Sequence, residues 1–145
     1  MKKLLAIVLL FFVISAFADA PDPQIRGFLD DLNLKYTNED TGFFIKDNNV
    51  LVCILHKKVD VAGVKGTVII FAHEYKDGLS RTMMRRMLEE NLVSNIGFWG
   101  ILDGNKVTYK IIVRENCTKQ EFSEALLVGV LSIEQFEKKI VRGEK

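Results

Sequence analysis

The stretch FWGILDGNKVTYKIIVR, residues 98–114, determines how this chain is expected to fold. Two apolar segments, Phe98–Leu102 and Lys106–Arg114, flank Asp103-Gly104-Asn105, which is a sequence typical of a hairpin turn. An antiparallel pair of strands is therefore predicted here. A two-residue turn, at either end of the Asp-Gly-Asn triplet, would fix the register of the pair and hence the face on which each side chain lies.

Helices are predicted on both sides of this hairpin. Before it, Ser80 caps a helix from about Arg81 to Val93, in which apolar residues recur at helical spacing. After it, Thr118 and Glu121 form a capping box that opens a long helix. Nearer the start of the chain, Asp22-Pro23 opens a shorter helix that ends at Asn33.

Three further strands are predicted between the first two helices, at Phe43–Lys46, Val50–Lys58 and Thr67–His73. The links between them are too short for helical crossovers, so neighbouring strands should run antiparallel. The element order is α-β-β-β-α-β-β-α. It predicts one α+β domain, residues 19–145, with a five-stranded antiparallel sheet and three helices.

Alternation along the strands predicts which side chains share a face. With a two-residue turn, Phe98 lies on the core face with Tyr109, whereas Trp99 and Ile101 lie on the opposite, more polar face. A lone tryptophan there needs cover, either from another part of the same chain or from a partner, since tryptophan is enriched at interfaces.

The central strands indicate a second apolar surface. Leu51, Cys53 and Leu55 point one way and Val52 and Ile54 the other, so both faces of the middle of the sheet are apolar. Three helices are not expected to cover both faces of five strands. The uncovered remainder would be a binding patch.

Methionines in the predicted helix at 81–93 offer a second indication of a binding surface. Met83, Met84 and Met87 form a pliable apolar stripe, which could fill the core or could suit protein partners of varied shape.

The first eighteen residues, MKKLLAIVLLFFVISAFA, are predicted to be a signal peptide. Two lysines precede an apolar run that is too short to span a bilayer, and Ala16-Phe17-Ala18 is a cleavage pattern that leaves Asp19 first. The product should be periplasmic or secreted, without membrane insertion after cleavage. Removing Lys2 and Lys3 leaves 18 basic against 19 acidic residues, which argues against nucleic-acid binding.

Cys53 and Cys117 are the two cysteines of the chain. In an oxidising compartment they could form a disulfide, while the alternative for Cys53 is a small buried apolar residue on a strand.

No catalytic, cofactor or metal site is predicted from the motifs. Cys53-x-x-His56 is half of a zinc motif, but strand alternation points the two side chains to opposite faces. His73-Glu74 lacks a nucleophile placed by any motif. The alternative to a non-enzymatic protein is a small apolar ligand carrier or a hydrolase. It would use His73, Glu74 or His56 at the mouth of a closed pocket, whose predicted lining is Phe71, Trp99 and Met87.

Residues 84–126 resemble the YbjN-like family and the type III secretion chaperones that share its fold. The matching text, at residues 85–126 of this stretch, is RRMLEENLVSNIGFWGILDGNKVTYKIIVRENCTKQEFSEAL. It contains a helix ending in Leu-x-x-Asn-Leu, a Gly-aromatic strand, an Asp-Gly turn, an apolar strand and a Thr-capped helix with Glu-Phe. The helix and strands upstream follow the same order.

The resemblance implies a domain that often dimerises and that uses apolar patches to hold a protein client. The dimer contact of those chaperones involves the second helix and the following strand, which correspond here to Met83, Met84, Met87, Asn91 and Trp99. Unlike those cytoplasmic, acidic chaperones, this chain carries a predicted export signal and a near-neutral charge. The expected function is therefore an exported, non-enzymatic, chaperone-like or regulatory protein. It would bind itself or a protein partner through these residues and Ile101.

Overall fold

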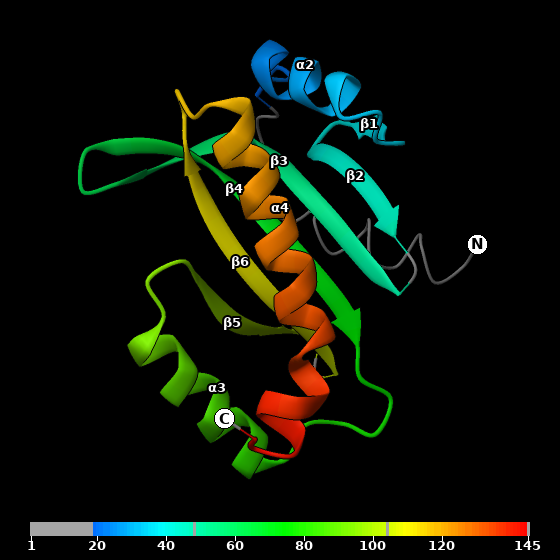
Figure 1. The fold of residues 1–145 in the computed structure, drawn as a ribbon, viewed down its shortest axis with the longest axis vertical. Helices are drawn as coiled ribbons and strands as arrows, with labels where there is room; N and C mark the ends of the chain where they lie inside the picture. The colour runs from blue at the N-terminus through cyan, green and yellow to red at the C-terminus, as the bar shows by residue number, and fades with distance from the viewer. Residues whose placement is uncertain (1–18, 48, 104, 145) are drawn as a thin grey trace.

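The computed structural model describes residues 19–47, 49–103 and 105–144, so the predicted signal peptide lies outside the described residues. The fold is α+β, with an open antiparallel sheet and helices packed on it (Figure 1). In chain order the elements are α2 (Pro23–Asp31), β1 (Thr37–Glu39), β2 (Gly42–Asp47), β3 (Val50–Val61), β4 (Val64–Glu74), α3 (Arg81–Val93), β5 (Gly97–Leu102), β6 (Lys106–Arg114), α4 (Lys119–Glu134) and the π-helical turn η2 (Glu137–Val141).

The described sheet has six strands in the order β1-β2-β3-β4-β6-β5, with every neighbouring pair antiparallel. The predicted α+β class with an antiparallel sheet is confirmed, but the predicted order of five strands and three helices lacks one strand and the π-helical turn η2. The additional strand is β1, three residues that pair with β2 from Thr37 opposite Phe44 to Glu39 opposite Gly42. Its polar sequence carries no strand signal, and pairing with β2 is what makes it a strand.

Helix starts follow the predicted caps. The Asp22 carboxylate accepts a hydrogen bond from Gln24 N at 2.8 Å. Ser80 Oγ accepts one from Met83 N, and Thr118 and Glu121 form the reciprocal capping box. Each cap satisfies backbone N–H groups that a first helical turn leaves without partners. Because these hydrogen bonds are local, the starts of the helices could be predicted from the sequence.

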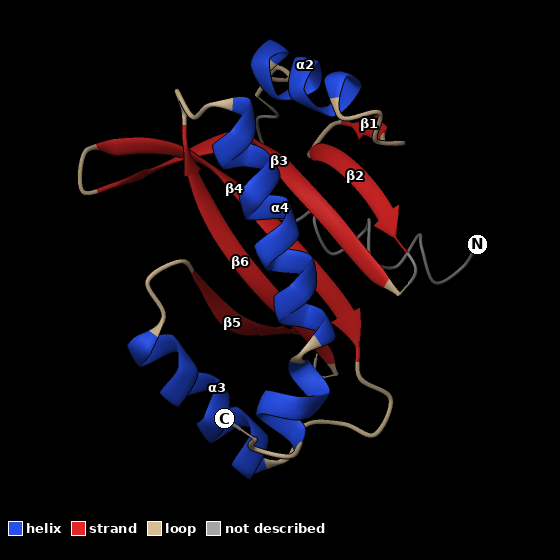
Figure 2. Cartoon of the chain, viewed as in Figure 1, coloured by secondary structure: helices blue, strands red, loops and turns tan. Residues whose placement is uncertain are grey.

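The helices lie on one face of the sheet (Figure 2). Their buried side chains belong to the main core of the protein. Helix α4 crosses the middle of this face, α2 covers the β2–β3 end, and α3 lies along the β5 edge (Figure 1). The largest fully buried side chains of this core include Phe43, Phe71 and Phe122.

The other face carries a smaller apolar cluster of Phe44, Cys53, Val68 and Ile70. The predicted two-sided apolar character of the central strands is therefore confirmed. Within the described ranges, no helix contributes a side chain to this second cluster.

The predicted register of the β5–β6 hairpin is wrong. Leu102 pairs with Lys106, so three residues separate the strands instead of two. Asp103 adopts a left-handed backbone with φ of 57°, and Asn105 N donates to Asp103 O at 2.7 Å, which closes the longer loop. One extra residue exchanges the two faces of β5. Trp99 therefore lies opposite Tyr109 on the core face, whereas Phe98 lies opposite Lys110 on the other face.

Candidate functional site

Two of the predicted partner-binding residues belong to the core of a single chain. Trp99 is only 6% exposed and packs on Tyr109, with ring centroids 4.9 Å apart, and on Phe136 at 5.7 Å. Met87, on the inner side of α3, is 3% exposed. The prediction that Trp99 lies on a polar sheet face is thus corrected. Its ring and Met87 instead seat α3 on the sheet.

Asn91 fastens α3 to the edge strand β5. Its side-chain Nδ2 donates to Trp99 O at 2.9 Å, and its Oδ1 accepts a hydrogen bond from Trp99 N. Ser94 Oγ accepts a further hydrogen bond from Gly97 N at 3.3 Å. The outer side of an edge strand has backbone N–H and C=O groups that could pair with a strand of another chain. The Asn91 amide binds both of these groups of Trp99 and so takes the place of a neighbouring strand.

The remaining predicted residues reach the surface to different degrees. Met83 is half-buried against the core, whereas Met84 and Ile101 are exposed. Leu88 and Leu92 are surface residues as well, 65% and 85% exposed, although no sequence motif marks them as such. Met84, Leu88 and Leu92 are spaced i, i+4, i+8 and form one exposed row, the outer α3 stripe. The spacing was visible in the sequence, but it does not say which of two adjacent apolar rows faces the sheet.

A groove of about 390 Å³ lies between α3 and α4, over β5 and β6. Trp99 and Tyr109 are on its floor, and Val93, Ile96, Val128 and Ser132 line its walls. Among the residues predicted to line a ligand pocket, only Trp99 is found here. Phe71 and Met87 are packed in the core, and neither histidine is in the lining.

The two histidines have separate, local partners. His56 is buried with its ring edge-to-face on Phe43, at 4.7 Å between centroids, and its Nε2 lies 2.9 Å from Glu39 O and 3.0 Å from Asn38 Oδ1. The Glu39 carbonyl can only accept, so Nε2 carries the hydrogen. His73 Nδ1 is 3.3 Å from Asn49 O. As predicted, His56 and Cys53 belong to opposite faces of the sheet.

Acid is expected to destabilise the protein through His56. Burial lowers the pKa of His56 below its ordinary value of 6.5, because the charged ring would lose hydration. The unfolded chain then binds more protons than the folded one as the pH falls through about 6.5, so the free energy of unfolding decreases over this range. Melting temperatures measured between pH 8 and pH 5 should show this decline.

His56→Gln should flatten the pH dependence between pH 7 and pH 5, because glutamine can still donate to the Glu39 carbonyl but does not titrate. His73→Gln is the matched control and should leave the decline unchanged. If both variants keep the wild-type pH dependence, His56 is not the group responsible.

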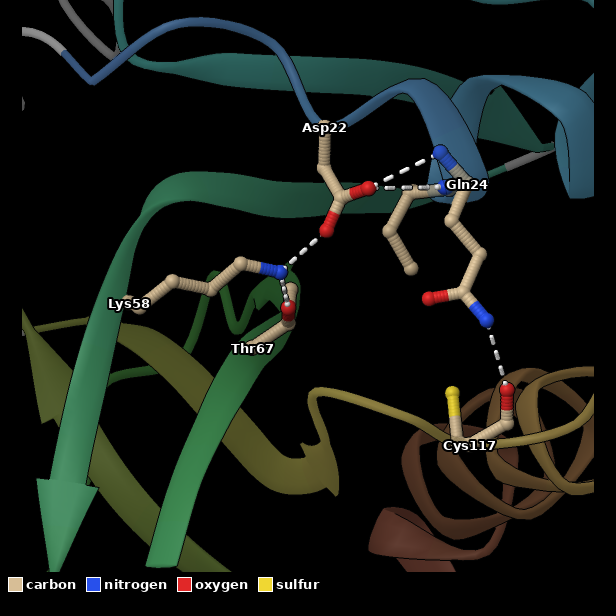
Figure 3. A network of polar contacts seen from close by, with 6 residues as sticks. Asp22, Gln24, Lys58, Thr67 and Cys117 are labelled. Carbon is tan, nitrogen blue, oxygen red and sulfur yellow. Dashed lines mark hydrogen bonds and ion pairs between the residues drawn. The ribbon is translucent and has the colours of Figure 1, made fainter.

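A polar network joins the start of α2 to the sheet and to the start of α4 (Figure 3). Lys58 Nζ donates to the Asp22 carboxylate and, at 2.7 Å, to Thr67 Oγ1. Gln24 Nε2 donates to Cys117 O at 3.0 Å. Lys58 follows an irregularity in the β3–β4 pairing after Ile54. Its ammonium thereby reaches under the α2 terminus (Figure 3).

The charges of this network stabilise the position of α2. Burial alone would raise the pKa of Asp22, but hydrogen bonds from Lys58 and Gln24 N and the positive charge of Lys58 lower the pKa below its usual 3.8. Thr67 is almost completely buried, and Lys58 donates to a carboxylate. The lysine is therefore a charged anchor for α2, not a base that activates the threonine.

Removing either partner of the Asp22–Lys58 pair should destabilise the fold. We expect Asp22→Ala to lower the free energy of unfolding by about 2 kcal/mol or more, because it removes both the helix cap and the partner of a half-buried ammonium. Lys58→Met should cost about 1–3 kcal/mol. Urea denaturation of both single variants and the double variant gives the coupling energy, expected to be about 0.5–3 kcal/mol.

Lys119→Met is the control, since Lys119 Nζ also pairs with a carboxylate, at 3.0 Å from Asp31 Oδ2, but both side chains are more than half exposed. Its loss should cost about 0.5 kcal/mol at most. Strictly additive effects of Asp22→Ala and Lys58→Met would contradict the pairing.

The disulfide considered from the sequence is not formed. Cys53 and Cys117 are both free and buried, the first in the cluster on the second face and the second in the main core. Burial raises the pKa of Cys53 to about 12 and raises that of Cys117 as well, so neither thiol is an activated nucleophile.

Over residues 19–47, 49–103 and 105–144, no three His, Cys, Asp or Glu side chains are grouped so as to hold a metal ion. The helices in these same ranges are each too short or too polar to cross a bilayer.

Comparisons with protein-family models, with curated proteins and with solved structures found no match to this chain. The likeness to the YbjN-like family therefore rests on the sequence pattern of residues 84–126.

Proposed function

We propose that this protein is an exported, non-enzymatic interaction module that forms a homodimer through the outer α3 stripe. The observation that carries the proposal is the exposure of Met84, Leu88 and Leu92 along one row of α3. Burying a leucine side chain is worth about 1.5–3 kcal/mol, and a continuous exposed apolar row of this kind is typical of an interface.

The charges on α3 favour a second copy as the partner. Beside the stripe, Arg81 and Arg85 lie toward the start of the helix and Glu89 lies toward its end. If a two-fold axis crosses α3, the two copies of the helix run antiparallel and each basic half meets an acidic half. The Arg85–Glu89 pair, 2.8 Å within one chain, is highly exposed and could exchange partners across such an axis.

The predicted dimer residues then divide by role. Met84 supplies contact area, and Ile101, which pairs with Val107 in the sheet, is a second exposed apolar residue, on β5. Met83, Met87, Asn91 and Trp99 hold α3 against the sheet, so they set the orientation of the stripe without belonging to it. Export to the periplasm or beyond is supported by the sequence of residues 1–18.

Light scattering coupled to size-exclusion chromatography tests the proposal on protein isolated after expression of the full chain. The wild type should elute with twice the chain mass and Leu88→Glu with the single mass, because a carboxylate in the apolar stripe would be desolvated without a partner. Leu127→Glu, at an equally exposed leucine of α4, should remain dimeric. A monomeric wild type at about 100 μM would exclude a dimer with a Kd near 1 μM or tighter. An intact mass beginning at Asp19 is expected for the exported product.

A further inference from the structure

The groove between α3 and α4 lies on the helix-covered face of the sheet. The two helices converge at η2, where Arg86 Nη1 donates to Ile140 O at 2.9 Å and to Val141 O at 2.6 Å. From this junction they diverge as a V over β5 and β6 (Figure 1). The groove lies where they are apart, toward the end of α3.

The base of the groove is aromatic, and its walls carry apolar side chains beside the polar Ser94, Asn95 and Ser132. Trp99 and Tyr109 present aromatic rings at the floor, and Gly97 beside them has no side chain that would cover Tyr109. Val93 and Ile96 on one wall are exposed. On the other wall, Val128 is followed one turn on by the exposed Leu131.

We propose that this groove binds an amphipathic α-helix of another protein, with apolar anchors spaced i, i+3 or i+4, and i+7. A volume of about 390 Å³ is at the small end of the range for ligand sites, so it suits a few anchor side chains better than a whole enclosed ligand. The flanking apolar residues on both walls extend the contact along the backbone of a docked helix, which would pack on α3 and α4 as helices pack on each other.

Charge on the walls specifies the flanks of the partner. Glu90 lines the groove from α3 and Lys139 from η2. A helix with basic residues on the side facing α3 and acidic residues on the side facing η2 would complement both walls.

A second copy of this chain is not the expected occupant of the groove. Glu90 and Val93 lie on the opposite flank of α3 from Met84 and Leu88, given about 100° per residue. A copy that inserted its outer α3 stripe into the groove would leave its own groove open for the next copy, which gives an open chain instead of a closed dimer. The groove and the proposed dimer surface are therefore separate sites.

The experiment uses the only tryptophan of the chain, Trp99, as the reporter on the groove floor. The probe is an acetylated and amidated peptide of 18 residues without tryptophan. It carries leucines along one helical face, lysines on one flank and glutamates on the other. A control peptide has the same composition with its leucines spread around the helix. We expect a saturable change in Trp99 emission with the first peptide only.

Three variants locate the binding. Val128→Glu should weaken binding about tenfold or more, because it places a charge in the groove wall. Lys139→Glu, an exposed change, should weaken this peptide and strengthen one whose flanking charges are exchanged. Leu88→Glu should leave binding unchanged even if it dissociates the dimer, which separates this proposal from the proposed function. Thermal melts establish that each variant is folded.

Equal responses to both peptides, no response to either, or unchanged affinity in both Val128→Glu and Lys139→Glu would overturn the proposal. A change in Trp99 emission that follows protein concentration without peptide and persists in Leu88→Glu would show that a second copy fills the groove instead.

Discussion

Gly129→Ala is expected to lower the free energy of unfolding by about 3 kcal/mol, a large part of the 5–15 kcal/mol that stabilises a typical domain. Gly129 lies in the middle of α4, where the helix rests directly on the ring of Phe71 in β4. A Cβ at this position would overlap three carbons of that ring, and Phe71 is completely buried. The ring cannot move aside in a close-packed core, so α4 would have to lift from the sheet.

The sign of this effect opposes helix propensity. Glycine inside a helix costs about 1 kcal/mol relative to alanine, so alanine would stabilise α4 if the position were open. Gly27 in α2 supplies the control, because a Cβ there meets nothing within 4 Å. Gly27→Ala should raise the free energy of unfolding by about 0.5–1 kcal/mol. Urea denaturation measures both variants. A gain at both positions would mean that α4 is not seated on Phe71.

Sequence patterns located the elements well because the signals are local. The first residues of α2, α3 and α4 follow from the N-caps Asp22, Ser80 and Thr118. Each of these side chains accepts a hydrogen bond from a backbone N–H within three residues. The contacts that unite these elements carry no such signal. Asp22 and Lys58 are 36 positions apart, and Gln24 and Cys117 are 93 apart. Residue types at those positions do not indicate that the fold brings them together.

The candidate site was harder to predict. Each wrong prediction there depended on one geometric feature that the sequence does not specify. The left-handed backbone of Asp103 adds one residue to the hairpin loop and exchanges the faces of β5. On α3, the rows beginning at Met83 and Met84 are about 100° apart, and the sheet covers only the first. Periodicity identified both rows but could not choose between them.

Trp99→Ala should cost about 3–5 kcal/mol of unfolding free energy, whereas Phe98→Ala should cost about 1 kcal/mol or less. The two residues are adjacent in β5, and the loop length alone decides which of them is buried. Trp99 contacts Tyr109 of β6 and Phe136 at the start of η2, so truncation would leave a cavity between these elements in the core. Phe98 is 41% exposed, with Lys110 Nζ 5.8 Å from the centroid of its ring.

Urea denaturation of the two alanine variants compares the registers directly. If the hairpin had a two-residue turn, Phe98 would face the core beside Tyr109 and the order of the two losses would be reversed. A larger loss in Phe98→Ala than in Trp99→Ala would therefore contradict the pairing of Leu102 with Lys106. It would also contradict the groove, whose floor needs Trp99 on the same face as Tyr109. Because the outer α3 stripe is oriented by the packing of Met87 and Asn91 near Trp99, the same outcome would remove the structural basis of the dimer surface.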